Sequence, residues 1–407
     1  MHQLLRICVV AAAALLVTAG TAPLADAADP APKQWYLNAI RADKIWKVST
    51  GKGIKVAVIG TGVNPGTPSL RGQVLRGKDA LVEAGLAKGS VTDTHDTTGA
   101  GTTAAELIAG TGRGGGLKGL APGVQIIPIR VPPIRHNELP DPNYPLSAAI
   151  TSAVDAGAQI IDITIGNQYV IGSDYDHQAL NYAVKKGVLM FAGTGDNAKE
   201  GNKQQYPAAY DEVVGVAAID RTGTVAPTSQ HGKEVEISAP GVDIPRWCDA
   251  TFRRYCVDGG GTAAASALMS ADAALVWSKH RDWTAAQVWR VLEDTAGRSW
   301  PADKTSVYLG YGGGRPYQVL VHGRGRPGPA DRNTTPWDVQ PLPGSPSHGP
   351  APRPSGTGTK PNSPAASTLA GSSHGSGLPL TGIAIGAAAA LVLAGGALWI
   401  LLRRRAR

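Results

Sequence analysis

Between residues 33 and 322, short runs of apolar and β-branched residues alternate with stretches in which apolar residues recur at helical spacing. The apolar runs predict strands at 54–60, 124–131, 159–166, 187–193 and 212–219. Such nearly continuous hydrophobicity is typical of strands that are covered on both faces. The segments 146–157 and 176–187 have helical spacing and end in Gly, a common C-terminal capping residue. The alternation predicts an α/β fold, a doubly wound and mainly parallel sheet with helices on both faces.

The N-terminal region does not have the pattern of a folded domain. Arg6 precedes an apolar run at 7–17, and small residues follow at 25–27. This order predicts a secretory signal peptide over residues 1–27, which leaves 28–322 as the folded domain. An uncleaved membrane anchor is the alternative, but the apolar run is short for a bilayer span.

The segment 323–377 is rich in Pro, Ser, Gly and Thr and has scarcely an apolar cluster. Such a composition cannot bury enough apolar surface to fold, so we predict a disordered, partly extended spacer. A solvated tail without a spacing role is the alternative.

The C-terminal residues 378–407 combine three features. An apolar run at 383–402 is long enough to cross a membrane as a helix, and four arginines after it would keep its end in the cytoplasm. A five-residue motif comes just before the run: Leu378, Pro379, Leu380, Thr381 and Gly382. The arrangement resembles an LPXTG-type cell-wall sorting signal, which implies a sortase as partner and a domain held outside the cell. A plain single-pass membrane anchor that no sortase cleaves is the alternative.

The formal net charge of +8 is concentrated near the C-terminus. Four positive charges belong to the terminal arginines and a net three to the spacer, so the folded body carries about +1. A nearly neutral body predicts no binding to nucleic acid.

Removal of the signal peptide leaves two cysteines, Cys248 and Cys256. In an exported chain two cysteines this close predict a disulfide. Two free thiols or half of a metal site are the alternatives, although the spacing fits no zinc pattern. We expect no metal and no cofactor.

Three segments, 56–63, 99–110 and 261–276, resemble the blocks around the catalytic Asp, His and Ser of subtilisin-type serine proteases, the subtilases. Other segments are similar to later blocks of the family, in the family's order: 117–131, 206–220, 225–244 and 310–320. The segment 34–53 resembles the strand with which the subtilase domain opens. The overall layout is most similar to the mycosin-type proteases of actinobacterial secretion systems. The resemblance implies a subtilisin-like fold.

Each catalytic block lacks the residue that would perform the chemistry. Gly60, Ala100 and Ala263 stand at the positions of the family's Asp, His and Ser. None of these side chains can orient a base, accept a proton or attack a carbonyl. Asp196 aligns with the family's oxyanion-binding Asn, where an ionised carboxylate would repel the developing charge. A shift of one residue would instead place Asn197 there.

Several nearby polar residues could in principle substitute for the missing groups: Asp79, Asp93, His95, Asp96, Glu106 and Ser266. We expect the three aspartates to be solvated loop residues and His95 to lie on the surface. We expect Glu106 to cap its helix or to be solvated, and not to act as a general base. Ser266 lies about 4.5 Å further along its helix than position 263, too far for a nucleophile. Asp272 departs from the small apolar residues usual in that helix.

The resemblance implies that an extended peptide could still pair beside the segment 162–168, with Thr164, Ile165 and Gly166 as the contact residues. The sequence therefore predicts a surface-anchored, catalytically inactive pseudoprotease that binds an extended peptide or a protein. Two alternatives stay open: an active, secretion-associated subtilisin-like endopeptidase that uses non-standard residues, and a structural wall protein.

Overall fold

The computed structural model describes residues 34–131, 146–166, 174–330 and 340–341. All of them belong to one unit, Met1–Pro350. The predicted signal peptide (1–27), most of the spacer (323–377) and the sorting signal (378–407) lie outside the described residues. None of the described helices is long and apolar enough to cross a membrane, and the predicted span at 383–402 falls outside them.

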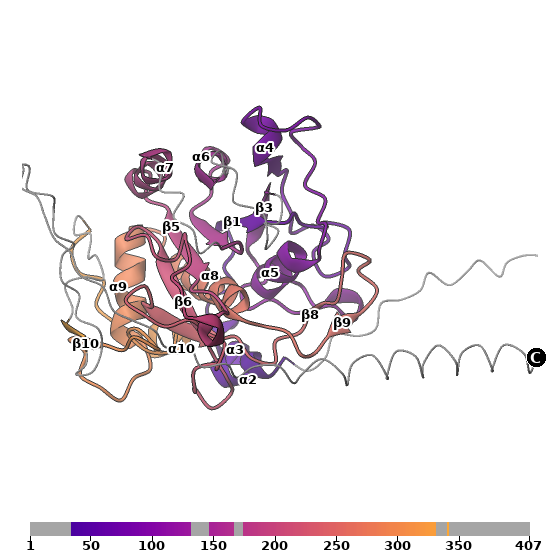
Figure 1. Ribbon diagram of the computed structural model, residues 1–407. Coiled ribbons are helices and arrows are strands. Elements are labelled where there is room, and N and C mark those ends of the chain that lie inside the picture. Colours follow the sequence, from indigo (N-terminus) through magenta and orange to yellow (C-terminus); the bar gives the residue numbers. More distant parts are fainter. Residues whose placement is uncertain (1–33, 132–145, 167–173, 331–339, 342–407) are drawn as a thin grey trace, which may run out of the picture. The chain divides into compact units, whose positions relative to one another are not determined.

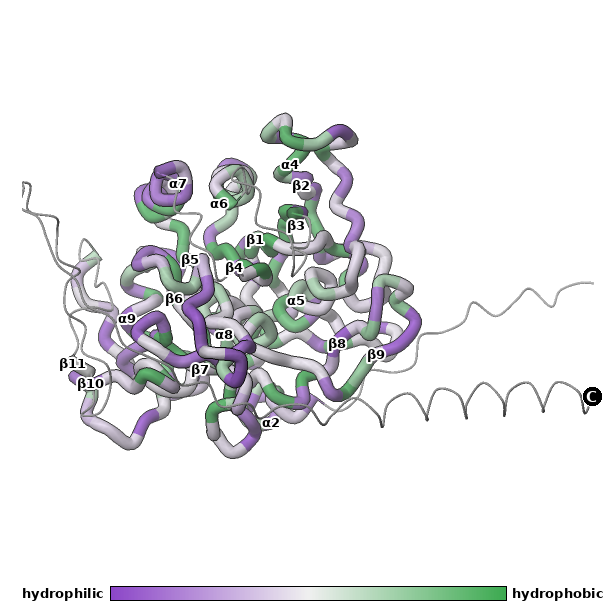
Figure 2. The backbone as a smooth tube through the Cα atoms, in the orientation of Figure 1, coloured by the Kyte–Doolittle hydropathy of each residue, from purple (hydrophilic) through white to green (hydrophobic). Residues whose placement is uncertain are grey.

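Seven strands form one parallel sheet in the order β2-β3-β1-β4-β5-β6-β7. The strands are β1 Lys55–Gly60, β2 Lys78–Asp79, β3 Gln125–Arg130, β4 Ile160–Ile163, β5 Leu189–Gly193, β6 Val214–Ile219 and β7 Ile237–Pro240. The central strand β1 pairs with both β3 and β4, so that Val56 lies between Ile126 and Ile160. Figure 2 shows the central strands β1, β3 and β5 in the green of apolar residues.

Helices cover both faces of this sheet (Figure 1). Helices α6 (Leu146–Asp155) and α7 (Asp174–Lys185) lie on one face, and α5 (Ala100–Ala109), α8 (Thr262–Lys279) and α9 (Ala285–Thr295) on the other. Because side chains alternate along a strand, Val56 and Val58 join the core beneath α5 and α8, whereas Ala57 and Ile59 join the core beneath α6. The predicted doubly wound parallel sheet is confirmed, including all five strands and both helices predicted from the apolar pattern.

The expectation of an opening strand within 34–53 is wrong. The segment forms two short helices, α2 (Trp35–Ile40) and α3 (Ala42–Ile45). Arg41 joins them in the left-handed conformation, with φ of 63°. Tyr36 is the buried residue of α2, and Ala42 and Ile45, three residues apart in α3, have the spacing of a helical face and not the alternation of a strand.

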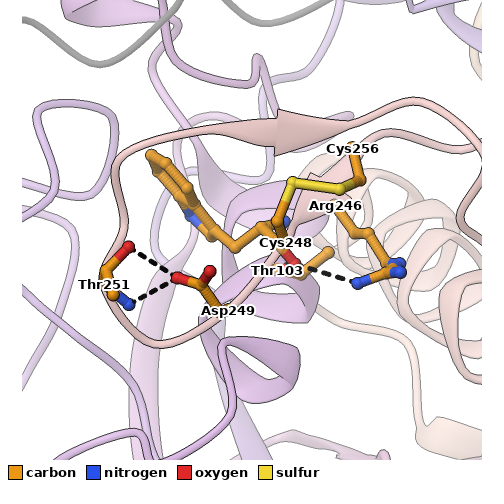
Figure 3. Close-up of a disulfide and its surroundings, with 7 residues drawn as sticks. Thr103, Arg246, Cys248, Asp249, Thr251 and Cys256 are labelled. Atoms are coloured by element: carbon orange, nitrogen blue, oxygen red, sulfur yellow. Dashed lines mark hydrogen bonds between the residues drawn. A yellow bond between two sulfur atoms is a disulfide. The ribbon is translucent and has the colours of Figure 1, made fainter. Parts of the chain in front are cut away.

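The remaining elements are short: α4 Ala80–Glu83, η1 Arg113–Gly115, η2 Ala198–Glu200, α10 Pro316–Leu320, β8 Arg246–Trp247, β9 Tyr255–Cys256, β10 Lys304–Thr305 and β11 Gln340–Pro341. Strands β8 and β9 form an antiparallel hairpin beside α5, and a disulfide joins Cys248 to Cys256 within it (Figure 3). The backbone N–H of Trp247 donates to the hydroxyl of Thr103, which attaches the hairpin to α5.

Candidate functional site

The three positions that match the catalytic residues come together at the carboxyl end of the central strands. Gly60 ends β1, Ala100 is the first residue of α5, and Ala263 is the second residue of α8. Ala100 and Ala263 both line a pocket of about 270 Å³, which we name the central pocket. Other residues of its wall include Thr98, Thr103, Thr164, Ile244, Arg246 and Trp247.

The space in front of Gly60 is occupied. A Cβ atom added at Gly60 would stand 2.3 Å from Oγ1 of Thr164. The Thr164 hydroxyl is held there because it donates to the carbonyl of Ile59 at 3.1 Å. The site therefore has neither a carboxylate at position 60 nor free room for one.

Asp96 is buried and performs a structural task, so the expectation that it is solvated is wrong. Its carboxylate accepts hydrogen bonds from the hydroxyls of Thr61 and Thr102 at 2.7 and 2.6 Å. The backbone N–H groups of Thr98, Gly99 and Thr102 also donate to it, at 2.8 to 3.0 Å. Asp96 thus satisfies the open donors at the start of α5 and has no free oxygen to direct toward a base.

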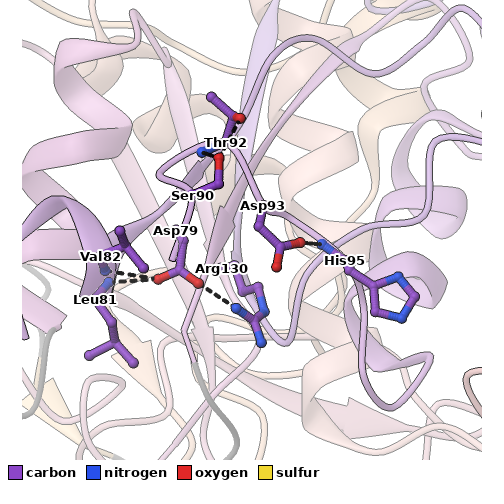
Figure 4. Close-up of polar contacts among 8 residues, drawn as sticks. All are labelled: Asp79, Leu81, Val82, Ser90, Thr92, Asp93, His95 and Arg130. Atoms are coloured by element: carbon purple, nitrogen blue, oxygen red, sulfur yellow. Dashed lines mark hydrogen bonds and ion pairs between the residues drawn. The ribbon is translucent and has the colours of Figure 1, made fainter. Parts of the chain in front are cut away.

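Asp79 is also buried, against expectation, and it too caps a helix (Figure 4). Its carboxylate accepts from the backbone N–H groups of Leu81 and Val82 at 3.0 and 3.1 Å and pairs with Arg130. Asp93 and His95 are exposed, as the sequence led us to expect, and Asp93 accepts from the His95 backbone N–H at 3.1 Å. None of these residues lines the central pocket.

Glu106 is completely buried, so the prediction of a capping or solvated role is wrong. Its carboxylate accepts from the hydroxyls of Thr67 at 2.8 Å and Tyr255 at 2.7 Å. Burial raises the pKa of Glu106 to about 7, against the lowering effect of these hydrogen bonds. The residue links α5 to the β8–β9 hairpin and stands behind the pocket wall.

Ser266 is buried in the middle of the core, below the site. Its hydroxyl donates to Asp162 of β4 at 2.6 Å, and Ser270 donates to the same oxygen at 3.3 Å. Burial raises the pKa of Asp162 to about 7. Sequence reasoning missed Asp162, although an Asp inside the apolar strand 159–166 was a visible signal. Ser266 has no path to a substrate in this arrangement, since its side chain is fully covered.

Asp272, further along α8, is buried as well, and burial raises its pKa well above the usual value. Like Asp162, it belongs to the interior of the domain and not to the cleft.

Asp196 follows β5 and lies against the start of α8. Its carboxylate accepts from the backbone N–H of Thr262 at 3.0 Å and from the Thr262 hydroxyl at 3.2 Å. Although the residue is partly open to solvent, burial of its carboxyl group raises the pKa of Asp196. The carboxylate is thus adjacent to Ala263, at the place where an oxyanion would need a donor. Asn197 is exposed and precedes η2.

Thr164, Ile165 and Gly166 follow the end of β4, and Thr164 lines the central pocket. The Thr164 backbone N–H donates to the carbonyl of Ile59 at 2.9 Å. No described residue forms a hydrogen bond with the backbone of Ile165 or Gly166. The segment therefore lies next to the pocket without main-chain pairing to any other described residue.

Within the part of the chain that the structure describes, no group of three or more His, Cys, Asp or Glu residues is arranged to hold a metal ion. The central pocket has apolar walls that include Ile244 and Trp247, hydroxyls with internal partners, and one charged side chain, Arg246. Among the described residues of its wall there is no serine, cysteine, histidine or carboxylate, the side chains that usually serve as nucleophile or general base.

The comparisons with known proteins concern the family and the fold. The profile of the Subtilase family (Peptidase_S8) matches residues 51–314. The chain is 32% identical over 252 residues to the minor extracellular protease Epr of Bacillus subtilis, covering 61% of this chain and 36% of Epr. It is 28% identical over 283 residues to thermitase of Thermoactinomyces vulgaris, covering 68% of this chain and 95% of thermitase.

Among solved structures, MycP1 of Mycobacterium smegmatis superposes with a TM-score of 0.60 and 25% identity. The match covers 77% of this chain and 89% of that structure. The match to the family profile spans more than half of the chain and contains Gly60, Ala100 and Ala263. The chain belongs to the subtilase family.

Proposed function

We propose that this chain is a catalytically inactive subtilase homologue, a pseudoprotease that binds an extended peptide or a protein segment outside the cell. One observation carries the proposal: the positions that resemble the catalytic Asp, His and Ser hold Gly60, Ala100 and Ala263, of which Ala100 and Ala263 line one pocket and Gly60 stands against Thr164 of its wall. Loss of any single triad member already costs orders of magnitude in rate.

The surroundings of the site support inactivity as well. Thr164 fills the room in front of Gly60, and Asp196 would place negative charge where negative charge develops during acyl transfer. The next serine along α8, Ser266, is buried and bound to Asp162.

The proposal of binding draws on Ile165 and Gly166, whose backbone forms no hydrogen bond with the other described residues. An extended peptide could add as a strand beside these residues, because main-chain pairing needs no triad. A Cβ added at Gly166 would meet Oε1 of Gln205 at 3.7 Å, an ordinary contact, so a side chain placed there would fit locally and obstruct the edge.

Labelling with a fluorophosphonate probe tests inactivity. We expect the purified full-length chain to remain unlabelled under conditions in which thermitase is labelled completely. Labelling that disappears in the Ser266→Ala variant would show that the chain is an active endopeptidase with a relocated nucleophile.

Capture of fluorescein-labelled β-casein, an extended polypeptide, tests binding. The full-length chain should retain casein without cleaving it, and Gly166→Trp should weaken retention by roughly tenfold or more. Gly66→Trp is the matched control, because Gly66 is equally exposed and lies away from the pocket wall. Equal retention by both variants would contradict an edge at Gly166, and no retention by the unaltered chain would favour a structural wall protein.

We further propose export through residues 1–27 and attachment through residues 378–407, with a sortase joining Thr381 to the wall. Cell fractionation tests this: Thr381→Ala should move the chain from the wall fraction to the membrane fraction. An unaltered chain found only in the membrane fraction would indicate a plain anchor through 383–402.

A further inference from the structure

The side chains that line the central pocket indicate more than main-chain pairing with a peptide. Its deep wall is formed by fully or almost fully buried apolar residues: Ala104, Leu107, Ile244, Trp247 and Ala264. Ala100 and Ala263 stand at its mouth, where a longer side chain would project into it. Two of the three positions assigned to the catalytic residues by resemblance, Ala100 and Ala263, thus lie beside an apolar space.

The hydroxyls of the wall already have partners. Thr103 donates to the carbonyl of Gly99 at 2.7 Å and accepts from the backbone of Trp247 at 3.0 Å. Thr164 donates to the carbonyl of Ile59 at 3.1 Å. A ligand group inside the pocket therefore meets an apolar environment, which disfavours a polar group without its own partner.

The size of the pocket limits the group that fits. At about 270 Å³ it exceeds the engineered cavities of about 150 Å³ that accept benzene. An aromatic or large aliphatic side chain can enter, whereas a small side chain would leave most of the apolar wall without contacts.

Arg246 supplies the one charged side chain of the pocket wall. It is exposed at the rim and donates to the carbonyl of Trp247 at 3.2 Å, and none of the described carboxylates forms an ion pair with it. The hairpin holds this arginine in place, because the disulfide between Cys248 and Cys256 closes the same two strands (Figure 3). A guanidinium at the edge of an apolar pocket is complementary to a carboxylate next to an apolar group.

We propose that the central pocket recognises a peptide by an aromatic or large aliphatic side chain that enters between Ala100 and Ala263, with an adjacent carboxylate on Arg246. The inference rests on the proposed function, because a peptide paired beside Ile165 and Gly166 would pass Thr164 at the mouth of the pocket. The carboxylate could be a C-terminal one or that of an internal Asp or Glu.

Fluorescence polarisation with the full-length chain and four labelled peptides tests the inference. The probes are AAAAF with a free carboxylate, AAAAF amide, AAAAFDAA amide and AAAAFNAA amide. The free-carboxylate peptide or the Asp peptide should bind roughly tenfold or more tightly than its neutral counterpart. The pair that shows this difference identifies the source of the carboxylate.

Variants assign the contacts. Arg246→Gln should abolish the difference between charged and neutral peptides, while Arg253→Gln, on the same hairpin and outside the pocket wall, should preserve it. Ala263→Phe should fill the pocket and eliminate binding of all four peptides. Ala100→Leu, at an exposed position, repeats that test with less risk to folding.

The outcomes separate this inference from the proposed function. Charged and neutral peptides that bind equally well, or binding that survives both Ala263→Phe and Ala100→Leu, would overturn the inference and leave an inactive peptide binder. Failure of all four peptides to bind, while casein is retained, would also overturn it. Failure to bind either casein or the peptides would overturn both proposals.

Discussion

Helix α8 has two regions of opposite character. Its first turn presents Ala263 to the central pocket, where the family carries a reactive hydroxyl. One and two turns further along, Ser266 and Ser270 donate to Asp162 in the interior of the domain. These two hydroxyls therefore lie where no substrate reaches them, whereas Ala263 in the pocket wall has no polar group. The contrast shows that the residues required for folding and those required for chemistry are separate on this scaffold.

The largest expected effect is on the rate of peptide hydrolysis, after catalytic side chains are introduced at the site. A variant with Gly60→Asp, Ala100→His and Ala263→Ser needs Thr164 to rotate away, and Asp196 would still oppose the oxyanion. Adding Asp196→Asn should raise the rate of hydrolysis of a chromogenic peptide by about a hundredfold or more over the triple variant. Both rates are measured side by side on the purified chains. Equal rates would show that Asp196 does not oppose the reaction.

The buried carboxyl groups should make the free energy of unfolding depend on pH. Burial raises the pKa values of Asp162, Glu106 and Glu293 to about 7, above those of the unfolded chain. The folded state then binds more protons than the unfolded state between about pH 4.5 and 7. The stability that these groups contribute is present below this window and is lost as the pH rises through it.

Urea unfolding between pH 5 and 7 measures this effect. Asp162→Asn should reduce the pH-dependent loss of the free energy of unfolding by about 1 kcal/mol per pH unit. Asp303→Asn, at an exposed position, is the matched control and should leave the slope unchanged. Identical slopes for all three chains would contradict a protonated Asp162 in the folded state.

The smallest expected effect is a difference in the free energy of unfolding between variants of the two regions of α8. Ser266→Ala removes the 2.6 Å hydrogen bond to the buried Asp162 and should lower the free energy of unfolding by about 1–2 kcal/mol. Ala263→Ser, in the half-buried first turn, should change it by less than about 0.5 kcal/mol. Thermal unfolding of both variants checks the comparison, and a reversed order would place the structural hydroxyl in the cleft.

The sheet could be predicted because its strands are continuous apolar runs, and that signal is local. The opening segment 34–53 could not be predicted from resemblance alone, since its course depends on Arg41 in a left-handed conformation between two short helices. The three-residue spacing of Ala42 and Ile45 contained the better signal.

The family-like sequence segments indicated which residues form the site, but they did not indicate which acidic residues are buried. Glu106 is buried because Tyr255, 149 residues later, donates to it. Asp79 is buried with Arg130, 51 residues away, as its ion-pair partner. Contacts this distant along the chain leave no periodic signal, so solvation was the natural but wrong expectation for these carboxylates.

The cap of α5 has a consequence for how such a chain can change over evolutionary time. Asp96, Thr61 and Thr98 together accept from the backbone donors of the first helical turn, and the side chain of residue 100 takes no part. The helix can therefore begin at the same place whichever side chain stands at that position. We therefore expect substitutions at residue 100 to alter the cleft while leaving the start of the helix in place.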